Sequence, residues 1–283
     1  MHTGNFSILC FLAVILTWAP QFLHAQEMSV MTYNIRYDNP DDGANAWSQR
    51  KAELANQISF HGPDILGIQE GLLHQVKYLD SALLDYRYVG QGRDDGRRKG
   101  EFCAIFFRHT RFEKLSEGTL WLSETPDRPS TGWDAALPRI ATWVRLDDLE
   151  DGRSLVVINT HFDHQGEQAR KESAKLLVTF VKSLERQGDA AVVLMGDFNA
   201  SPDEEPIKQL DFSLFDSHDE SLDPPFGPTG TWANWQVGNS LDRRIDYIWV
   251  NEGFTVEKYG VLTDHRNGRY YSDHLPVWVQ LSR

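Results

Sequence analysis

Polar side chains lie at the ends of five apolar runs in this 283-residue chain, and their types are those that bind metals and move protons. One run, Ala191–Met195, leads into Gly196-Asp197-Phe198-Asn199, and another, Pro276–Val279, follows Ser272-Asp273-His274. Apolar runs of this length between turn residues are typical of buried strands. Carboxylates, carboxamides and an imidazole at strand ends face solvent on a rigid frame, where they can bind metal or transfer protons. The other three runs are Val30–Asn34, Ile65–Glu70 and Ile245–Val250.

The side chains at these strand ends form one candidate site. Carboxylates beside carboxamides supply the hard oxygen ligands that Mg²⁺ or Mn²⁺ prefers. Zinc would need several His or Cys at close spacing, and His161 and His164 approach that pattern without an HExxH or CxxC motif. Each residue taken singly also has a structural interpretation, as a turn residue, a helix-terminal acid or half of a surface salt bridge. The candidate residues are Asn34, Glu70, Asp197, Asn199, Asp246, Asp273 and His274.

Strand–helix–strand units in both halves of the chain would position these strand ends. Helical periodicity predicts helices over residues 48–60, with Ser48 as the cap, and over 72–83 and 168–184. Strand-like runs joined by turn-rich segments cover residues 102–107, 119–122, 140–146 and 155–159. Further strands are expected over 254–261 and 277–281. We therefore predict an α/β fold, in which two mixed β-sheets pack face to face with the helices outside. The catalytic groups would gather at one end of this sandwich.

Composition predicts one globular domain without a strongly basic surface. Hydrophobic residues make up 41% of the chain, which is enough for a substantial core. The net charge of −13 argues against tight, non-specific binding of duplex DNA, and no obligate protein partner is indicated. One glycine-flanked basic cluster is either a solvated hairpin tip or a lid that contacts phosphate. Its residues are Arg93, Arg97, Arg98 and Lys99.

The N-terminal segment is typical of a secretory signal peptide. Residues 1–25 contain no Asp, Glu, Lys or Arg, and Phe6–Trp18 is almost continuously apolar, too short for the roughly 20 apolar residues of a membrane span. Cleavage after Ala25 would leave a domain over 26–283, exported to the periplasm or the medium, with no membrane span. The alternatives are an uncleaved anchor or a buried N-terminal strand. Cys103 would remain as a single buried, inert thiol, so no internal disulfide is expected.

Six short motifs follow one another along the chain: Thr32-Tyr33-Asn34-Ile35, Ile68-Gln69-Glu70, Asn159-Thr160-His161, Gly196-Asp197-Phe198-Asn199, Arg244-Ile245-Asp246-Tyr247 and Ser272-Asp273-His274. Together they resemble the endonuclease/exonuclease/phosphatase superfamily. Two further segments, Trp121–Pro126 and Gly132–Arg139, are similar to exported bacterial members near its deadenylase- and nocturnin-like branch. The resemblance covers residues 28–283 and implies a four-layer α/β sandwich.

The same resemblance implies a metal-assisted attack of water on a phosphate ester. Glu70 would bind Mg²⁺ or Mn²⁺, with Asn34 beside it and Asp273 assisting. Asp197 would deprotonate or orient the attacking water, and Asn199 would hold the water or the scissile phosphate. A phosphate ester is anionic and repels hydroxide, so a divalent cation and hydrogen-bond donors must offset the added negative charge.

Two histidines would contact the phosphate in this scheme. Asp246 would orient His274, which as an imidazolium would stabilise charge that develops on the phosphate oxygens. His161 would contact the same phosphate. Three arginines either bind phosphate or substrate, or brace loops. They are Arg50, Arg139 and Arg170.

The expected function is therefore that of a Mg²⁺-dependent phosphoesterase that uses in-line attack of an activated water. Its phosphate-containing substrate would be a small phosphorylated molecule, a phosphorylated glycan or a lipid headgroup. The alternative within enzymology is a nuclease, in particular a 3′–5′ RNA exonuclease. A second alternative is a non-catalytic glycan-binding module that uses the aromatic side chains Trp133, Trp232 and Trp235.

Overall fold

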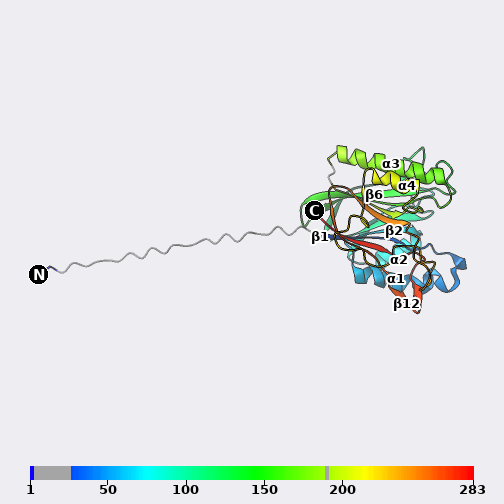
Figure 1. The fold of residues 1–283 in the computed structure, drawn as a ribbon, viewed down its shortest axis with the longest axis horizontal. Coiled ribbons are helices and arrows are strands. Elements are labelled where there is room, and N and C mark those ends of the chain that lie inside the picture. Colours follow the sequence, from blue (N-terminus) through cyan, green and yellow to red (C-terminus); the bar gives the residue numbers. More distant parts are fainter. Residues whose placement is uncertain (3–26, 189–190) are drawn as a thin grey trace.

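The computed structural model describes residues 1–2, 27–188 and 191–283, so the predicted signal segment falls almost entirely outside the described residues. Residues 27–283 form two six-stranded sheets that pack face to face, with helices on both outer faces (Figure 1). The predicted layers of helix, sheet, sheet and helix are therefore confirmed. Within the described ranges, no helix combines the length and apolar character needed to cross a membrane.

The first sheet is mixed and has the order β11-β14-β1-β2-β4-β3. Strand β1 pairs in parallel with β2 and antiparallel with β14, so the ends of β1 and β2 reach the same edge of the sheet. Its strands, in chain order, are β1 Glu27–Asn34, β2 Ile65–Gly71, β3 Tyr86–Val89, β4 Phe102–Arg108, β11 Thr255–Val261 and β14 Val277–Ser282.

The second sheet has the order β5-β6-β7-β8-β10-β9 and is also mixed. Strand β8 pairs in parallel with β7 and antiparallel with β10, so one end of β8 lies between the end of β7 and the start of β10. Its strands are β5 Phe112–Trp121, β6 Ile140–Asp148, β7 Arg153–His161, β8 Val192–Asp197, β9 Phe215–Asp216 and β10 Asp246–Val250. A separate hairpin joins β12 His265–Arg266 to β13 Arg269–Tyr270.

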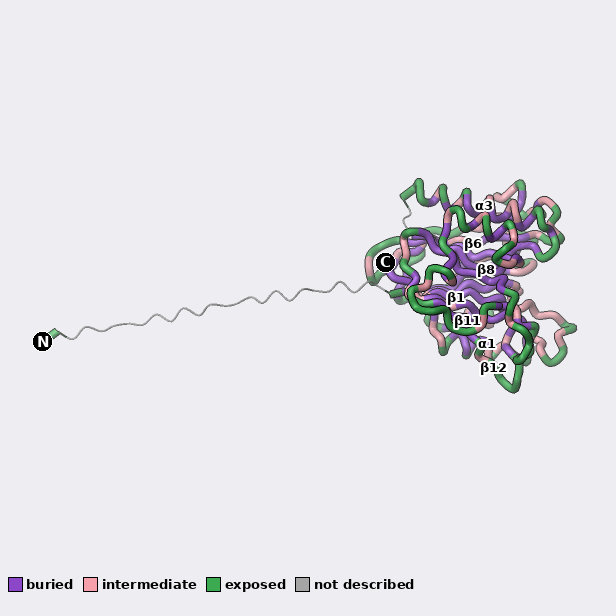
Figure 2. The backbone as a smooth tube through the Cα atoms, viewed as in Figure 1, coloured by how far each residue is buried: buried purple, intermediate pink, exposed green. Residues whose placement is uncertain are grey.

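Helices cover each sheet on its outer face (Figure 1). Helices α1 (Trp47–His61) and α2 (Leu73–Ala82) pack on the first sheet, and a short 3₁₀ helix, η1 (Pro40–Asn45), precedes α1. Helices α3 (Glu167–Arg186) and α4 (Glu205–Asp211) pack on the second. Figure 2 shows the buried backbone concentrated in the two sheets, where strand side chains of both inner faces form the central core. Burial of these apolar side chains is the main favourable contribution to folding.

A buried amide pair joins the two sheets beneath the strand ends. Asn159 in β7 donates from Nδ2 to the carbonyl oxygens of Ile68 and Ala104 in the first sheet, at 2.9 Å each. Its Oδ1 accepts a hydrogen bond of 2.6 Å from Nε2 of Gln69, which also donates to Thr32. Because all of these groups are buried, the hydrogen bonds fix the position of one sheet relative to the other.

Two predicted element starts are wrong. Helix α1 begins at Trp47, and its N-cap is Ala46 with no side-chain hydrogen bond, so Ser48 does not cap the helix. Strand β5 begins at Phe112 rather than near residue 119. It lies at the edge of its sheet and exposes residues 113–117, which are polar except for Leu115. Such an edge segment lacks the apolar pattern that marks a buried strand.

Candidate active site

Strand pairing brings the predicted polar groups to one end of the sandwich. In the second sheet, Asp197 at the end of β8 is paired directly with His161 of β7 and with Asp246 of β10. In the first sheet, Asn34 ends β1 beside Gln69 of β2, one residue before Glu70. The two ends face each other, since Nδ2 of Asn34 lies 2.9 Å from Oδ2 of Asp197.

A cleft of about 380 Å³ opens at this end of the molecule. Seven of the predicted site residues line it: Glu70, Arg139, His161, Asp197, Asn199, Asp273 and His274. Two others, Asn34 and Asp246, are fully buried and reach the cleft through hydrogen bonds to residues that line it. The sequence therefore predicted most of the cleft wall, although the motifs are up to some 240 residues apart in the chain.

The backbone is strained at two of these residues. Glu70 and Asn199 have φ angles of 64° and 46°, in the left-handed region that side chains other than glycine rarely adopt. Glu70 lies where the pairing of β2 with β4 shifts in register, which turns its side chain toward the cleft. Such strain persists where the surrounding structure over-determines it, and it is concentrated at functional sites.

Gly196 is required immediately before Asp197. Its φ angle is 147°, and a Cβ atom at this position would lie 2.0 Å from the carbonyl oxygen of Thr160. Any side chain would therefore separate β8 from β7 at the point where Asp197 and His161 meet. This close approach explains the glycine in the Gly196-Asp197-Phe198-Asn199 motif.

His274 is held by Asp246 and directed toward Asp197. Its Nδ1 lies 2.9 Å from Oδ2 of Asp246, and its Nε2 lies 3.8 Å from Oδ2 of Asp197. Burial by itself would lower the pKa of His274, but the charges of Asp246 and Asp197 raise it to about 10. The ring is therefore an imidazolium at neutral pH, with Nδ1–H donated to Asp246 and Nε2–H left for the cleft.

Asp197 occupies the centre of the cleft wall. Its Oδ1 accepts a hydrogen bond of 2.9 Å from the backbone N–H of Asn199, and its Oδ2 accepts one from Asn34. Burial and the nearby negative charge of Asp246 raise the pKa of Asp197 well above its usual range. A carboxylate of this kind can take up a proton near neutral pH, as a general base must.

His161 has the opposite protonation state from His274. Asn199 Nδ2 donates to the carbonyl oxygen of Phe162 and lies 3.1 Å from Nε2 of His161, so Nε2 is the acceptor. Burial and the positive charge of Arg139 lower the pKa of His161 well below its ordinary value. The neutral ring thus carries its proton on Nδ1, and Nδ1–H is its remaining donor.

Three side chains at the cleft could hold a divalent metal. Oxygen or nitrogen atoms of Glu70, His161 and Asp197 all lie within 4.8 Å of one another. The two carboxylates suit a hard cation such as Mg²⁺ or Mn²⁺. Asn34 lies beside Glu70, where its Nδ2 donates to Glu70 and Asp197 and its Oδ1 accepts from the backbone of Arg36. In this orientation it positions the two carboxylates, and its role at the metal stays a prediction.

Asp273 lines the cleft beside this group. Its Oδ2 lies 3.7 Å from a guanidinium nitrogen of Arg36, and burial raises its pKa. The preceding residue, Ser272, donates a hydrogen bond of 2.7 Å to the carbonyl oxygen of Asn34 and so attaches this turn to the end of β1. The position suits the assisting role predicted for Asp273, either at the metal or in support of the site.

The three predicted arginines have different surroundings, and one of them lines the cleft. Arg139 is buried there, donates from Nε to Asp163 and lies beside His164. Arg50 donates hydrogen bonds to the backbone carbonyls of residues 35, 36, 45 and 271. Arg170 donates to the backbone carbonyl of Asp163. Arg50 and Arg170 do not line the cleft, so we assign them to loop bracing rather than to substrate binding.

The basic cluster forms a turn beside the cleft. Asp95 accepts hydrogen bonds from the backbone N–H groups of residues 97–99 through Oδ1, and the side chains of Arg97, Arg98 and Lys99 are exposed. These three are a solvated hairpin tip. Arg93 is buried instead and pairs with Glu101, which lines the cleft.

Two residues of the site, Thr231 and Glu101, were not identified from the sequence. Thr231 accepts from the backbone N–H of Asp246 and donates to its Oδ2 at 2.6 Å, so it holds the orienting carboxylate. Neither it nor Glu101 belongs to one of the six motifs: Thr231 lies in a loop, and Glu101 directly precedes β4. The further lining residues are Arg36, Tyr37, Leu137, His164 and Trp232.

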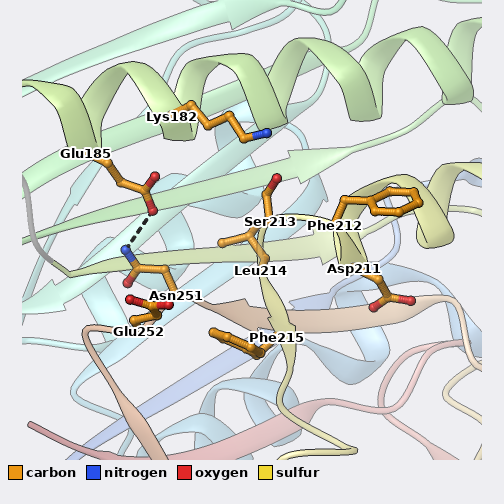
Figure 3. A pocket seen from close by; sticks show the side chains of 9 residues that line it. All are labelled: Lys182, Glu185, Asp211, Phe212, Ser213, Leu214, Phe215, Asn251 and Glu252. Atoms are coloured by element: carbon orange, nitrogen blue, oxygen red, sulfur yellow. Dashed lines mark hydrogen bonds between the residues drawn. The ribbon is translucent and has the colours of Figure 1, made fainter.

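A second pocket, of about 490 Å³, lies between the end of α3, α4, β9 and the start of the β10–β11 turn (Figure 3). None of the predicted site residues lines it. Its wall combines Lys182 and Glu185 of α3 with the exposed side chain of Phe212 and with Asn251, which donates to Glu185. Because no strained backbone or paired histidine accompanies it, the chemistry of the site belongs to the smaller cleft.

The sequence profile of the Endonuclease/Exonuclease/phosphatase family matches residues 31–274. This range includes all six motifs, from Asn34 in β1 to His274. The chain belongs to this family. With the cleft described above, it is a hydrolase that acts on phosphoester bonds.

Three proteins with named activities or families are similar to this chain. A mannosyl-6-phosphatase from Bacteroides thetaiotaomicron is 40% identical, with a TM-score of 0.87 over 90% of this chain and 100% of that one. Nocturnin from Xenopus laevis is 26% identical over 83% of this chain and 65% of its own length. A probable RNA exonuclease from Schizosaccharomyces pombe is 27% identical over 63% of this chain. The chain thus spans less than two thirds of this nocturnin, and only 37% of that exonuclease.

Proposed function

We propose that this chain is a Mg²⁺-dependent phosphatase that removes phosphate from sugars or phosphorylated glycans. The observation that carries the proposal is the arrangement of His274 between Asp246 and Asp197, in a cleft that also contains Glu70. It combines a protonated donor with a carboxylate of raised pKa. These are the two groups that hydrolysis of a phosphate ester by water requires.

The residues of the cleft divide the reaction between them. Asp197 takes a proton from the attacking water, and the backbone N–H of Asn199 holds its carboxylate in place. Nε2–H of His274 donates to the phosphate oxygens as negative charge develops on them. Because Asp246 fixes the ring through Nδ1, this donor needs no reorientation during the reaction.

Charge in the cleft supports a requirement for a divalent cation. Its lining holds more carboxylates than cationic groups, so a phosphate dianion alone would be repelled. Glu70 would hold the cation, with Asp273 assisting, and Asp197 beside them would remain the base. When bound, it would supply Lewis-acid neutralisation of the phosphate oxygens. The carboxylates are Glu70, Glu101, Asp197 and Asp273, and the cationic groups are Arg36, Arg139 and His274.

A sugar phosphate is favoured over other phosphate esters by three observations. The mannosyl-6-phosphatase shares 40% of its residues with this chain, whereas the nocturnin and exonuclease relatives share 26% and 27%. The cleft also has two aromatic side chains in its wall, Tyr37 and Trp232, suited to contact with the apolar face of a sugar ring. The net charge of −13 is unfavourable for a long polyanion.

The second candidate function is a 3′–5′ RNA exonuclease. It is supported by the similarity to the probable RNA exonuclease, which covers 63% of this chain. Both activities would use the same cleft, and they differ in the group that leaves the phosphate. A panel of substrates therefore separates them.

The experiment compares mannose 6-phosphate, inositol phosphates, sphingomyelin and a short RNA, each with Mg²⁺ and with EDTA. We expect Mg²⁺-dependent release of phosphate from the sugar ester and none with EDTA. Cleavage of RNA alone would overturn the proposal. Asp197→Ala and His274→Ala should abolish hydrolysis without loss of folding, and a wild-type protein that binds glycans but hydrolyses no ester would establish the non-catalytic alternative.

We further propose that the enzyme acts after export. The uncharged segment 1–25, with its apolar stretch Phe6–Trp18, supports this placement. Expression of the full chain in a bacterial host, followed by N-terminal sequencing of the periplasmic protein, tests it. A mature N-terminus near Gln26 is expected, and retention of residues 1–25 in the cytoplasm would contradict the proposal.

A further inference from the structure

Glu101 lines the cleft and is fixed there by Arg93. Its Oε2 lies 2.6 Å from Nη1 of Arg93, and the backbone N–H of Arg93 donates to the carbonyl oxygen of Glu101 at 3.1 Å. Trp121 anchors the other side of this turn by donating from Nε1 to the carbonyl oxygen of Arg93. The carboxylate is therefore held by a buried guanidinium on a braced turn, and it does not depend on a long, free side chain for its position.

The second oxygen of Glu101 distinguishes it from Glu70 and Asp197. Both oxygens of Glu70 accept hydrogen bonds, from Asn34 and from the backbone of Tyr37, and both oxygens of Asp197 are engaged as described above. Oε1 of Glu101 makes no hydrogen bond to any residue that the structure describes. Glu101 also lies outside the group of side chains that could hold a metal. Its free acceptor is thus available to a substrate.

We propose that Glu101 selects the leaving group, by accepting a hydrogen bond from a hydroxyl of a polyol phosphate. This inference rests on the proposed sugar-phosphate activity and names the residue that recognises the sugar. A carboxylate accepts hydrogen bonds and cannot donate them, so it matches the hydroxyls of a sugar. The same carboxylate repels an additional phosphate, so a leaving group that carries one, such as a nucleotide chain, is disfavoured.

The position of Glu101 relative to His161 places this contact beside the reacting phosphate. Oε2 of Glu101 lies 3.9 Å from Nδ1 of His161, and Nε2 of His161 lies 3.5 Å from Oδ2 of Asp197. In the proposed binding mode, the phosphate lies at Asp197 and His274 and the ester group is directed toward Glu101. In this role the contact adds to binding and orientation of the leaving group.

The test compares mannose 6-phosphate with p-nitrophenyl phosphate, whose leaving group has no hydroxyl donors. Glu101→Ala should lower kcat/KM for the sugar ester roughly tenfold more than for the nitrophenyl ester, since it removes one hydrogen bond to a charged acceptor. Glu101→Gln keeps the shape of the side chain and should show a smaller change in the same direction. Glu113→Gln, an exposed position on β5, is the matched control and should leave both rates unchanged.

Deoxy analogues of mannose 6-phosphate identify the hydroxyl. Wild type should lose kcat/KM with the one analogue that lacks the contacted hydroxyl, and Glu101→Ala should show no further loss with it, because the two changes remove the same interaction. Two outcomes would overturn the role of Glu101 while leaving the phosphatase activity established. One is an equal loss of kcat/KM on the sugar ester and the nitrophenyl ester in Glu101→Ala. The other is a further loss of kcat/KM when Glu101→Ala is combined with the deoxy analogue. A wild-type enzyme that hydrolyses p-nitrophenyl phosphate but no sugar phosphate would overturn the proposed function, and this inference with it.

Discussion

Nδ1 of His274 lies 2.9 Å from Oδ2 of Asp246, and both side chains are buried at the end of the cleft. The two residues are 28 positions apart in the chain and come from different sheets, since Asp246 begins β10 and His274 precedes β14. This contact fixes which ring nitrogen faces the cleft. It also supplies the negative charge that keeps His274 protonated at neutral pH.

Asp246→Asn should lower kcat roughly 100-fold or more with little change in KM, because the ring loses both its orientation and the charge that keeps it protonated. Steady-state kinetics on a sugar phosphate measure this. Activity falls as the pH rises through the pKa of His274, which is about 10 in wild type. In the variant this pKa is lower, so its activity should fall at a lower pH. Asp203→Asn, an exposed acid, is the control. A rise in KM alone would mean that Asp246 does not act through His274.

Glu70→Gln should weaken divalent-metal binding at least about tenfold, because it removes a charged oxygen ligand from the candidate group. Calorimetric titration of the folded protein with Mn²⁺ measures the affinity without reference to activity. Glu220→Gln, at an exposed position, should bind Mn²⁺ as wild type does. Unchanged affinity in Glu70→Gln would place the metal elsewhere.

Asn159→Ala should lower the free energy of unfolding by about 2 to 4 kcal/mol, since it leaves buried polar groups of both sheets without partners. The groups affected are the Gln69 amide and the carbonyl oxygens of Ile68 and Ala104. Ser154→Ala, at an exposed position of the same strand, should change it by less than about 0.5 kcal/mol. Urea denaturation measures both variants. Equal losses of unfolding free energy in Asn159→Ala and Ser154→Ala would show that the hydrogen bonds of Asn159 between the two sheets add no stability.

Asp163 should make the free energy of unfolding depend on pH in the acidic range. Burial alone would raise its pKa, but the backbone N–H groups of Gly166 and Gln165, with Arg139, lower it to about 2. Since the folded pKa lies below the ordinary value of 3.8, the stabilisation is present above about pH 4 and is lost as pH falls toward 2. It amounts to about 2 kcal/mol.

Urea denaturation of wild type and Asp163→Asn between pH 7 and pH 2 measures this difference. The variant keeps the shape of the side chain and has no carboxylate to titrate. The gap in unfolding free energy should be constant from pH 7 to about pH 4 and should close by about pH 2. A gap that is independent of pH would contradict the assignment.

Residue types at strand ends predicted the architecture and most of the cleft. Buried strands such as β8 carry their own apolar signal, and Asp197 and Asn199 follow directly from it. The parallel pairings of β1 with β2 and of β7 with β8 then place those ends together. The fold and most of the residues that line the cleft were therefore predictable from local pattern and topology.

The residues that the sequence did not reveal depend on contacts between distant segments. Thr231 supports Asp246 from a loop without periodicity, and Glu101 acquires its role through Arg93 in a neighbouring turn. Arg50 was indistinguishable in the sequence from an arginine that binds substrate, and its contacts with four backbone carbonyls show that it braces loops. Tertiary contacts of this kind leave no pattern in the flanking residues.

The central claim is that Asp197 directs water to the phosphorus of a phosphate ester in this cleft. Hydrolysis of mannose 6-phosphate in ¹⁸O-labelled water, with Mg²⁺, tests it most directly. We predict one ¹⁸O atom in the released phosphate and none in the sugar, with turnover abolished in Asp197→Ala. Label in the sugar, or undiminished turnover by Asp197→Ala, would contradict the account.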